Sequence, residues 1–492
     1  MQIQLDELIS KAPSVEKMIV DTVNFNGSLI VSGITNASNE IEQNFLFVAI
    51  KGYSYDGHDF AIEAVKKGAS VLVVERPLET SCCQIVIREQ KARKALGELS
   101  AAFYDFPFAK LKTVGITGTN GKTSVAHMVK SILDNNDMPA EIVGTLQSVR
   151  TTPEAHILNR IAYEAIASGK KALVMEVSSI GLALGRVEGI HFDVGAFTNL
   201  SHDHLDFHSS MEEYFTAKKS LFYRCDKAVI FQNDAWSSRL IDEISNLDGL
   251  EVKTVNHSVA TNIVPHLSGT RFKVEEFEIS LSWGGIFSID NAIVAYYIGL
   301  SLSIMPEKVA RGISSTPPVK GRFEMVRAPT DNTPLVVVDY AHTPDALKAA
   351  LVSARIITGN KVAVVFGCGG DRDKSKRSEM GKTASELADV IVVTTDNPRN
   401  EDPNEIVKQI VADLDPSTYV VELDRAKAIE LAVSLTSNQD VVLIAGKGHE
   451  NYQIFKDNQV EFSDADIAKR VIDGIISSKS PSNSISKTGG IS

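Results

Sequence analysis

The stretch KTVGITGTNGKTS, residues 112–124, constrains this chain more than any other. Its β-branched start predicts a strand over 113–117, and the glycines that follow predict a tight turn into a helix. Such a turn points backbone N–H groups into one hole, with the positive end of the helix behind them. We expect it to bind phosphate, with Lys122 on the terminal phosphates of a nucleotide and Thr123 on its Mg²⁺. The alternative is an ordinary glycine turn, because Ile116 stands where the P-loop spacing places a glycine.

Length and charge narrow the class of protein. The 492 residues are too many for one hydrophobic core, so we expect about three domains. The formal net charge of −12 argues against a nucleic acid as main partner, because phosphate backbones need clustered Lys and Arg. No apolar run approaches the ~20 residues of a membrane span, and the N-terminus has no basic start before an apolar core. We therefore expect a cytoplasmic monomer whose partners are small molecules, with no nucleic acid and no membrane partner.

The four cysteines, Cys82, Cys83, Cys225 and Cys368, do not have the spacing of metal ligands. We expect buried, reduced thiols, which agrees with a reducing compartment.

The order of the predicted elements divides the chain into four segments and predicts a three-domain α/β fold. Residues 1–105 form a small α/β unit without a recognisable catalytic group, so we expect it to bind a ligand. In 106–325, apolar strands alternate with helices, as in a doubly wound parallel sheet that carries the P-loop. Residues 326–478 repeat this alternation as a Rossmann-like α/β domain. The low-complexity tail 479–492 is expected to be disordered.

Polar residues follow two apolar strands of the middle segment. The run 172–179 contains Glu176 near its end, and the run 192–208 ends in histidines and carboxylates that include His204. Ligands of parallel sheets gather beyond the carboxyl ends of the strands. Because the spacing fits no zinc pattern, we expect Mg²⁺ with oxygen ligands and one histidine.

Two other polar residues of this segment carry no specific signal in the sequence pattern. Lys218 reads as a solvated charge on a helix, and Asn291 lies in the first turn of a predicted helix, where an amide can serve as a cap.

The third segment contains four predicted strands, PLVVVD, KVAVVF, DVIVV and DVVLIA, and each ends in a polar cluster. Paired arginines at such an edge bind carboxylates in a forked geometry. The polar residues expected near this edge are Asp339, His342, Arg372, Asp396, Arg399, Lys447, His449 and Glu450.

Twelve or so motifs in order, among them TGTNGKT, EVSS, HDHLDFH, AKKSLF, GRFE, DYAHTPDAL, DNPRNEDP and GKGHENYQ, resemble those of the Mur ligases, and within them the UDP-N-acetylmuramoyl-tripeptide synthetases. The resemblance covers nearly the whole chain and implies ATP-dependent amide-bond formation. ATP phosphorylates a carboxylate of a UDP-sugar peptide, an amino group attacks the acyl phosphate, and ADP and phosphate leave. The chemistry fits these residues, because two anions meet and the site needs Mg²⁺ and lysine more than a protein nucleophile.

The resemblance also implies roles for matching residues. The ATP-binding residues are expected to be Gly118, Thr119, Asn120, Gly121, Lys122, Thr123, Ser124, Asn291, Arg322 and Asp339. The expected catalytic residues are Lys122, Glu176, His204 and Lys218, and the expected magnesium ligands are Thr123, Glu176, His204 and Lys218. Lys218 matches a lysine that is carbamylated in the family (N6-carboxylysine), which converts an ammonium into an anion facing the metal. The residues expected to bind the UDP-MurNAc-dipeptide are Ser38, Thr151, Thr152, Ser178 and Arg186.

The amino-acid substrate is indicated by one motif. Branches that add meso-diaminopimelate carry Asp-Asn-Pro-Arg, as this chain does, whereas relatives that add lysine lack the arginine. Diaminopimelate has a second zwitterionic end, and the carboxylate of this end needs a cation. Arg399 and Arg372 are expected to supply it. The residues expected at this site are Arg372, Asp396, Asn397, Pro398, Arg399, Gly446 and Glu450. The alternatives are that Arg399 pairs structurally with Glu401 or Asp402, and that lysine is added instead.

The chain departs from the family on the side of the sugar nucleotide. The family's Asp-Ser-Arg is Ala37-Ser38-Asn39, Arg150 replaces an asparagine, and Ile180 replaces a histidine. A second hypothesis is therefore a diverged ligase that activates another carboxylate. A third, a non-catalytic nucleotide-binding partner, predicts loss of Lys122, His204 or Lys218, and all three are present.

Overall fold

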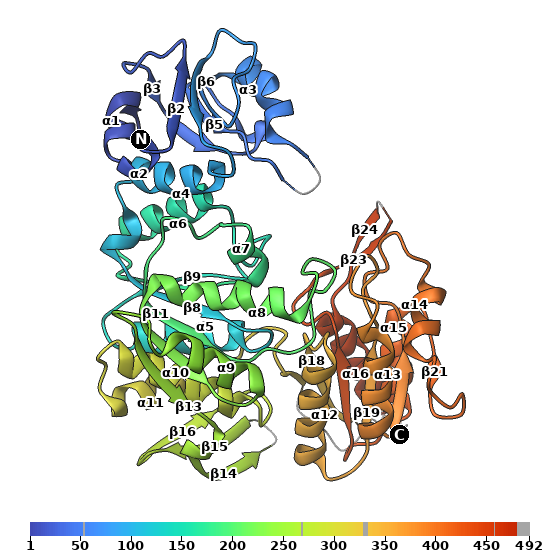
Figure 1. The fold of residues 1–492 in the computed structure, drawn as a ribbon. Coiled ribbons are helices and arrows are strands. Elements are labelled where there is room, and N and C mark those ends of the chain that lie inside the picture. The colour runs from blue at the N-terminus through green and yellow to red at the C-terminus, as the bar shows by residue number, and fades with distance from the viewer. Residues whose placement is uncertain (53–54, 267–268, 328–332, 457, 480–492) are drawn as a thin grey trace, which may run out of the picture. The chain divides into compact units, whose positions relative to one another are not determined.

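The computed structural model describes residues 1–52, 55–266, 269–327, 333–456 and 458–479 (Figure 1). They fall into two compact units, and each is described by itself. The first comprises Met1–Leu200, Phe207–Val259 and Asp290–Thr316, and the second Ser201–Asp206, Ala260–Ile289 and Pro317–Ser492. This division is coarser than the predicted domains 1–105, 106–325 and 326–478, so those boundaries stay a prediction. The predicted disordered tail lies outside the described residues, apart from residue 479.

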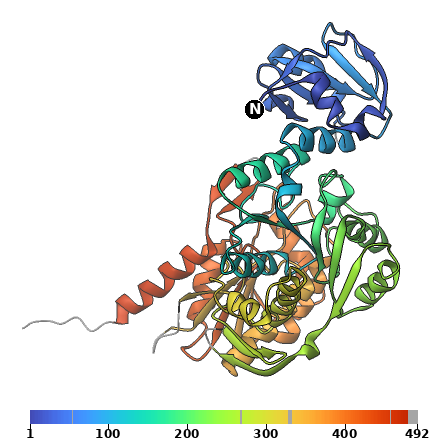
Figure 2. The same ribbon diagram turned by 90° about the vertical axis from the view of Figure 1, so that its left-hand side faces the viewer.

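A five-stranded sheet in the order β2-β7-β6-β5-β4 forms the N-terminal part of the first unit. Its elements are β1 (Ile3–Gln4), α1 (Leu5–Ser10), α2 (Pro13–Glu16), β2 (Ile19–Val23), β3 (Ile30–Val31), β4 (Gly33–Thr35), η1 (Ser38–Glu40), β5 (Phe45–Val48), η2 (Gly57–Phe60), α3 (Ala61–Lys67), β6 (Ala69–Val74), β7 (Cys83–Ile87) and α4 (Ala92–Phe103). Successive side chains of a strand point to opposite faces. In β6, Val71 and Val73 pack with α1, α2 and α4, and Leu72 and Val74 pack with α3. Both ribbon views show this layering in blue (Figures 1 and 2).

The rest of the first unit is built on a six-stranded parallel sheet in the order β13-β12-β11-β8-β10-β9, which confirms the predicted parallel sheet. Its elements are η3 (Pro107–Lys110), β8 (Lys112–Thr117), α5 (Lys122–Asp134), β9 (Ala140–Val143), α6 (Ala155–Ala167), β10 (Ala172–Glu176), α7 (Ser179–Ala183), β11 (Phe192–Phe197), α8 (Met211–Lys219), η4 (Ser220–Arg224), β12 (Cys225–Phe231), α9 (Ala235–Ile244), β13 (Glu251–Val255), η5 (His257–Val259), α10 (Ser288–Ser301) and α11 (Pro306–Ser314). Helices α6, α7, α8 and α9 contribute to one apolar core against this sheet, and α5 contacts β8, β9, β10 and α11. The strand β8, which precedes the glycine turn, lies between β11 and β10.

The second unit contains a six-stranded sheet in the order β17-β18-β22-β19-β20-β21, parallel except for β17. Its elements are β14 (Ala260–His266), β15 (Gly269–Val274), β16 (Phe277–Leu281), β17 (Glu324–Arg327), β18 (Leu335–Asp339), α12 (Pro344–Thr358), β19 (Val362–Phe366), α13 (Lys376–Leu387), β20 (Val390–Val393), α14 (Pro403–Ile410), β21 (Val420–Val421), α15 (Arg425–Ser434), β22 (Val441–Ala445), β23 (Tyr452–Phe455), β24 (Asn458–Glu461) and α16 (Asp464–Lys479). One face of the sheet packs against α12, α13 and α14, and the other against α15 and α16. The four predicted strands are confirmed as β18, β19, β20 and β22, whose Val, Ile and Leu runs are buried on both faces.

Two antiparallel elements of the second unit were not expected from the sequence. The strands β14, β15 and β16 form a three-stranded sheet, and β23 and β24 form a hairpin. Within the described ranges, no helix is long and apolar enough to cross a membrane.

Candidate active site

A glycine-rich turn joins β8 to α5, where the sequence predicts a phosphate-binding loop. β8 ends at Thr117 and α5 begins at Lys122, so both flanking elements are confirmed. Gly118 and Gly121 have φ angles of +149° and +90°, which residues with side chains rarely adopt. A Cβ atom on Gly121 would lie 2.3 Å from Oδ1 of Asn291. The turn therefore requires glycine, and Asn291 of α10 lies against it, where the ATP site is expected.

The remaining residues of the turn are held by neighbouring strands and helices. The Asn120 amide donates to Oδ1 of Asn199 at 2.9 Å, and the Thr119 and Tyr214 hydroxyl groups lie 3.0 Å apart. Ser124 is buried in the first turn of α5. These contacts tie the turn to α8 and to the segment that follows β11.

Two lysines donate to the same backbone carbonyl of this turn. Nζ of Lys122 donates to the carbonyl oxygens of Gly118 and Thr119 at 2.8 and 2.9 Å. Nζ of Lys218 donates to the Gly118 carbonyl at 2.7 Å and lies 4.6 Å from the centre of the Tyr214 ring. Two ammonium groups thus meet at the loop, and this concentration of positive charge suits a polyphosphate.

Lys218 is not the solvated charge that the sequence pattern indicates, because its exposure is 1%. Its helix α8 buries Tyr214 and Phe215 together with Lys218. The pattern gave no warning, because a lysine among charged neighbours is normally found at the surface.

Glu176 ends β10 and is buried beside the P-loop. Its Oε2 accepts a hydrogen bond from the Thr123 hydroxyl at 2.9 Å, and its Oε1 accepts from the Thr145 amide at 2.9 Å. A hydroxyl and a carboxylate in contact are oxygen donors of the kind that Mg²⁺ prefers, so Thr123 and Glu176 fit that ion. The described residues contain no group of three or more His, Cys, Asp or Glu that could hold a metal.

Most residues expected to bind the acceptor form one network beyond β10. The Thr152 hydroxyl donates to the Glu176 carbonyl at 3.0 Å, and the Ser178 amide donates to Thr152 Oγ1 at 2.9 Å. Nη1 of Arg186 donates to the Thr152 carbonyl at 3.0 Å, and the Thr151 hydroxyl lies 3.1 Å from that of Thr145. Ser38, the fifth expected residue, begins η1 on the N-terminal sheet. Four of the five expected residues are therefore brought together.

Three arginines surround one carboxylate next to this network. Glu154 lies 3.1 Å from Arg150, 2.9 Å from Arg186 and 3.6 Å from Arg93. Burial lowers the pKa of Arg186, and the charges of Arg150 and Arg93 add to that effect while Glu154 opposes it. The group carries more positive than negative charge, which favours an anionic ligand. No sequence motif indicates Arg93 or Glu154, because α4 meets this loop only in the folded chain.

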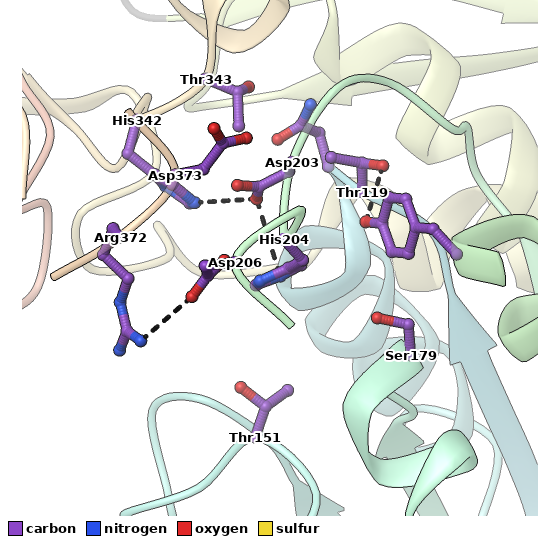
Figure 3. A network of polar contacts seen from close by, with 12 residues as sticks. Thr119, Thr151, Ser179, Asp203, His204, Asp206, His342, Thr343, Arg372 and Asp373 are labelled. Carbon is purple, nitrogen blue, oxygen red and sulfur yellow. Dashed lines mark hydrogen bonds and ion pairs between the residues drawn. The ribbon is translucent and has the colours of Figure 1, made fainter. Parts of the chain in front are cut away.

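In the second unit, the expected metal ligand His204 belongs to a network around Asp203 (Figure 3). The carboxylate of Asp203 lies 3.1 Å from Nζ of Lys376, 3.4 Å from Nε2 of His342 and 3.6 Å from Nε2 of His204. Burial alone would raise the pKa of Asp203, but the His342 hydrogen bond and the charges of His204, His342 and Lys376 hold it well below its usual value. Asp203 is therefore ionised, and it ties the segment 201–206 to this unit.

Arg372, expected to bind the amino acid, contacts the same segment. Its Nη1 lies 3.5 Å from Oδ2 of Asp206 (Figure 3). The Arg372 side chain is 57% exposed, so the pair is accessible to water and weak. A carboxylate ligand can compete with Asp206 for this guanidinium.

Arg399 does not form the structural ion pair that we considered as an alternative. Its Nη1 donates to the carbonyl oxygens of Gly370 and Asn397 at 2.7 and 3.5 Å. Glu401 pairs instead with Arg377, whose hydrogen bond lowers the Glu401 pKa to about 2 against the effect of burial. Asp402 accepts from the Asn404 amide at the start of α14.

The other residues expected at the amino-acid site surround the same loop. A Cβ atom on Gly446, whose φ is +112°, would lie 2.7 Å from Oδ2 of Asp396. Nδ2 of Asn397 donates to Oε2 of Glu450 at 2.8 Å, and the Pro398 carbonyl accepts from the Glu401 amide at 3.0 Å. The second unit thus brings the motif 396–399 next to Gly446 and Glu450, as the sequence predicts.

Asp339 ends β18, and Arg322 precedes β17. Asp339 is buried and accepts from the Phe323 amide at 2.6 Å, and burial raises its pKa to about 6 although the charge of Arg322 opposes this. The Arg322 guanidinium lies 4.5 Å from the centre of the Tyr340 ring. Both belong to the second unit, whereas Asn291 and the P-loop belong to the first.

Comparisons with known proteins agree along the chain. The family model "Mur ligase family, catalytic domain" matches residues 30–104, "Mur ligase middle domain" matches 116–299, and "Mur ligase, glutamate ligase domain" matches 321–448. A protein of Clostridium perfringens (strain 13 / Type A), named "UDP-N-acetylmuramoyl-L-alanyl-D-glutamate--2,6-diaminopimelate ligase", is 38% identical over 466 residues, which are 90% of this chain and 95% of the relative. A protein of the same name from Caldanaerobacter subterraneus subsp. tengcongensis is 40% identical over 464 residues, covering 91% and 96%.

Solved structures share the fold. One titled "Structure of UDP-N-acetylmuramoyl-L-alanyl-D-glutamate--2, 6-diaminopimelate ligase" has a TM-score of 0.66 at 27% identity, covering 96% of this chain and 99% of that one. The MurF ligase of Thermotoga maritima in complex with ADP has a TM-score of 0.64 at 18% identity, covering 91% and 98%, and it supports the fold alone. With three family models and near full-length relatives in agreement, this chain belongs to the Mur ligase family.

Proposed function

We propose that this chain is the ATP-dependent ligase that joins meso-2,6-diaminopimelate to UDP-MurNAc-L-Ala-D-Glu in the synthesis of peptidoglycan precursors. The observation that carries the proposal is the similarity, at 38% and 40% identity over nine-tenths of the chain, to two proteins named as ligases of this kind. The motif at 396–399 also supports diaminopimelate as the amino acid. Diaminopimelate has a second carboxylate at its far end, which needs a cation, whereas lysine has no carboxylate there.

A carboxylate of the acceptor's glutamate attacks the γ-phosphorus of ATP, and ADP leaves. The substrate's amino group then attacks the acyl carbon, loses a proton, and releases phosphate. Lys122 donates to the Gly118 carbonyl, where its charge favours the approach of two anions. Lys218 reaches the same carbonyl and would, once carbamylated, contribute an anion for the metal. Thr123 and Glu176 are the residues that would hold Mg²⁺, which when bound neutralises phosphate charge.

Binding of the other substrates is assigned to other groups of each unit. The cluster of Arg93, Arg150 and Arg186 would receive anionic groups of the acceptor, and the network of Thr152 and Ser178 its polar groups. Arg372 and Arg399 would receive a carboxylate of diaminopimelate. Asn291, Arg322 and Asp339 are proposed to contact the nucleotide.

Release of ADP tests the proposal. The purified enzyme is incubated with ATP, Mg²⁺ and UDP-MurNAc-L-Ala-D-Glu, with meso-diaminopimelate, with L-lysine or with no amino acid. We expect steady ADP release only with diaminopimelate. ADP release with L-lysine but not with diaminopimelate would mean that lysine is the amino-acid substrate. No ADP release with this acceptor would favour a ligase that activates another carboxylate, a candidate that the unusual Arg150 supports.

We further propose that the enzyme acts as a cytoplasmic monomer and that its domain boundaries lie near residues 105 and 325. We also propose that Lys218 carries the carbamate implied by the resemblance. Sedimentation of the purified protein tests the monomer, and limited proteolysis tests the boundaries, because exposed linkers are cut first.

A further inference from the structure

A buried lysine lies beneath the loop 396–399. Lys447 follows β22 and has an exposure of 0%. Its Nζ donates to Oδ1 of Asn397 at 3.1 Å and to Oε2 of Glu450 at 3.0 Å. Nδ2 of Asn397 donates to the same Glu450 oxygen at 2.8 Å. The three side chains therefore form a closed triangle of hydrogen bonds.

The triangle contains one positive and one negative charge with little access to water. The side chain of Lys447 is 0% exposed and that of Glu450 is 17% exposed. A buried ammonium is tolerated only with a partner that compensates its charge, and Glu450 is that partner. Within the described residues, the hydrogen bonds from Asn397 and from Lys447 both end on Oε2 of Glu450. Oε1 is thus the oxygen left to meet a ligand.

Asn397 is fixed from a second side by the hairpin of β23 and β24. The Ile454 amide donates to Oδ1 of Asn397 at 3.0 Å, and the Arg399 amide donates to the Ile454 carbonyl at 3.0 Å. Because Oδ1 accepts from two donors, the amide has one orientation, with Nδ2 toward Glu450. Lys447 and the hairpin together determine where Glu450 and the backbone of Arg399 lie.

From this geometry we propose that Lys447 is a positioning residue for the amino-acid substrate. The inference rests on the proposed function and deepens it. Lys447 is buried and does not touch the substrate; it holds Oε2 of Glu450, so that Oε1 receives the ammonium group at the far end of a diamino acid. Its effect on substrate binding therefore passes through Glu450.

A double-mutant cycle tests this dependence. The variants are Lys447→Met, Glu450→Gln and the double variant, with Lys427→Met as control, because Lys427 also pairs with an acid three residues away but is 69% exposed. Steady-state ADP release is measured while diaminopimelate and ATP are varied in turn. We expect Lys447→Met to raise the KM for diaminopimelate roughly tenfold or more, and the KM for ATP less than roughly twofold. The control should match the wild type.

The decisive comparison is between Glu450→Gln and the double variant. If Lys447 acts through Glu450, adding Lys447→Met to the Glu450→Gln variant changes the KM for diaminopimelate by less than roughly twofold. Glu450→Gln leaves the buried Lys447 ammonium without its charged partner, whereas the double variant carries neither charge and remains informative against the wild type if a single variant does not fold. A large further rise in the double variant, or equal changes in both KM values, would overturn the inference. Wild-type enzyme that is inactive with diaminopimelate would instead refute the proposed function and this inference with it.

Discussion

Replacing Arg399 by alanine tests how the enzyme selects its amino acid. One edge of the guanidinium is held by the protein, because Nη1 donates to the Gly370 carbonyl at 2.7 Å. Within the described part of the chain, no carboxylate forms an ion pair with Arg399. The other edge can therefore receive a substrate carboxylate through two parallel hydrogen bonds.

The size of the effect follows from that geometry. Hydrogen bonds between charged groups contribute about 1.5–3 kcal/mol each, and truncating a forked pair costs about 2–4 kcal/mol of binding. At 1.4 kcal/mol per factor of ten, Arg399→Ala should raise the KM for diaminopimelate about 30- to 700-fold. Arg399→Lys keeps the charge without the fork and should give an intermediate KM.

The assay is steady-state ADP release, with one substrate varied and the others saturating. Arg355→Ala is a matched control, since this arginine of α12 is 41% exposed and pairs with Asp389 in the same unit. The KM for ATP should change less than roughly twofold in every variant. Equal increases in the KM values for ATP and diaminopimelate, or no increase in either, would refute the assigned role.

Three further predictions concern Glu176, Lys218 and Asp339. Glu176→Gln should raise the Mg²⁺ concentration for half-maximal activity roughly tenfold or more, because a neutral amide is a poorer ligand; an unchanged Mg²⁺ titration would contradict this. Lys218→Ala should abolish ADP release, and added acetate should restore part of it if a carbamate is the active form, whereas Lys219→Ala, which loses an ion pair with Glu243, should stay active. Asp339 has its pKa raised to about 6 from 3.8, so its protonated form stabilises the fold and that stabilisation is lost as the pH rises from about 4 to 6. Asp339→Asn, which does not titrate, should therefore gain about 3 kcal/mol relative to the wild type between pH 4 and pH 7 in urea unfolding; a constant difference would contradict the burial of the charge.

Much of the fold was predictable because its signals are local. The β-branched run before Gly118 and the helix-forming residues after Lys122 define β8 and α5 by themselves. The position of Glu176 at the carboxyl end of β10 follows from the rule that parallel strands present their polar ends at one edge. The strands of the C-terminal sheet follow from continuous Val, Ile and Leu runs.

The contacts between distant residues were not predictable in the same way. Lys218 is buried because Tyr214 and the Gly118 carbonyl receive its ammonium, and α8 alone has no pattern that shows this. Asn397 and Lys447 are brought together only when β22 and the loop after β20 lie side by side. The strands β14, β15 and β16 carry polar and exposed residues, so they lack the continuous apolar run that marks the buried parallel strands.

The proposed reaction requires that ATP phosphorylates a carboxylate of the acceptor before the amide bond forms. Oxygen-18 placed in the glutamate carboxylates of UDP-MurNAc-L-Ala-D-Glu tests this order, with mass spectrometry of the released phosphate after turnover with diaminopimelate. Each phosphate should carry one labelled oxygen, because the oxygen that attacked ATP leaves with the phosphate. Phosphate that contains no label while the amide product accumulates would contradict the account.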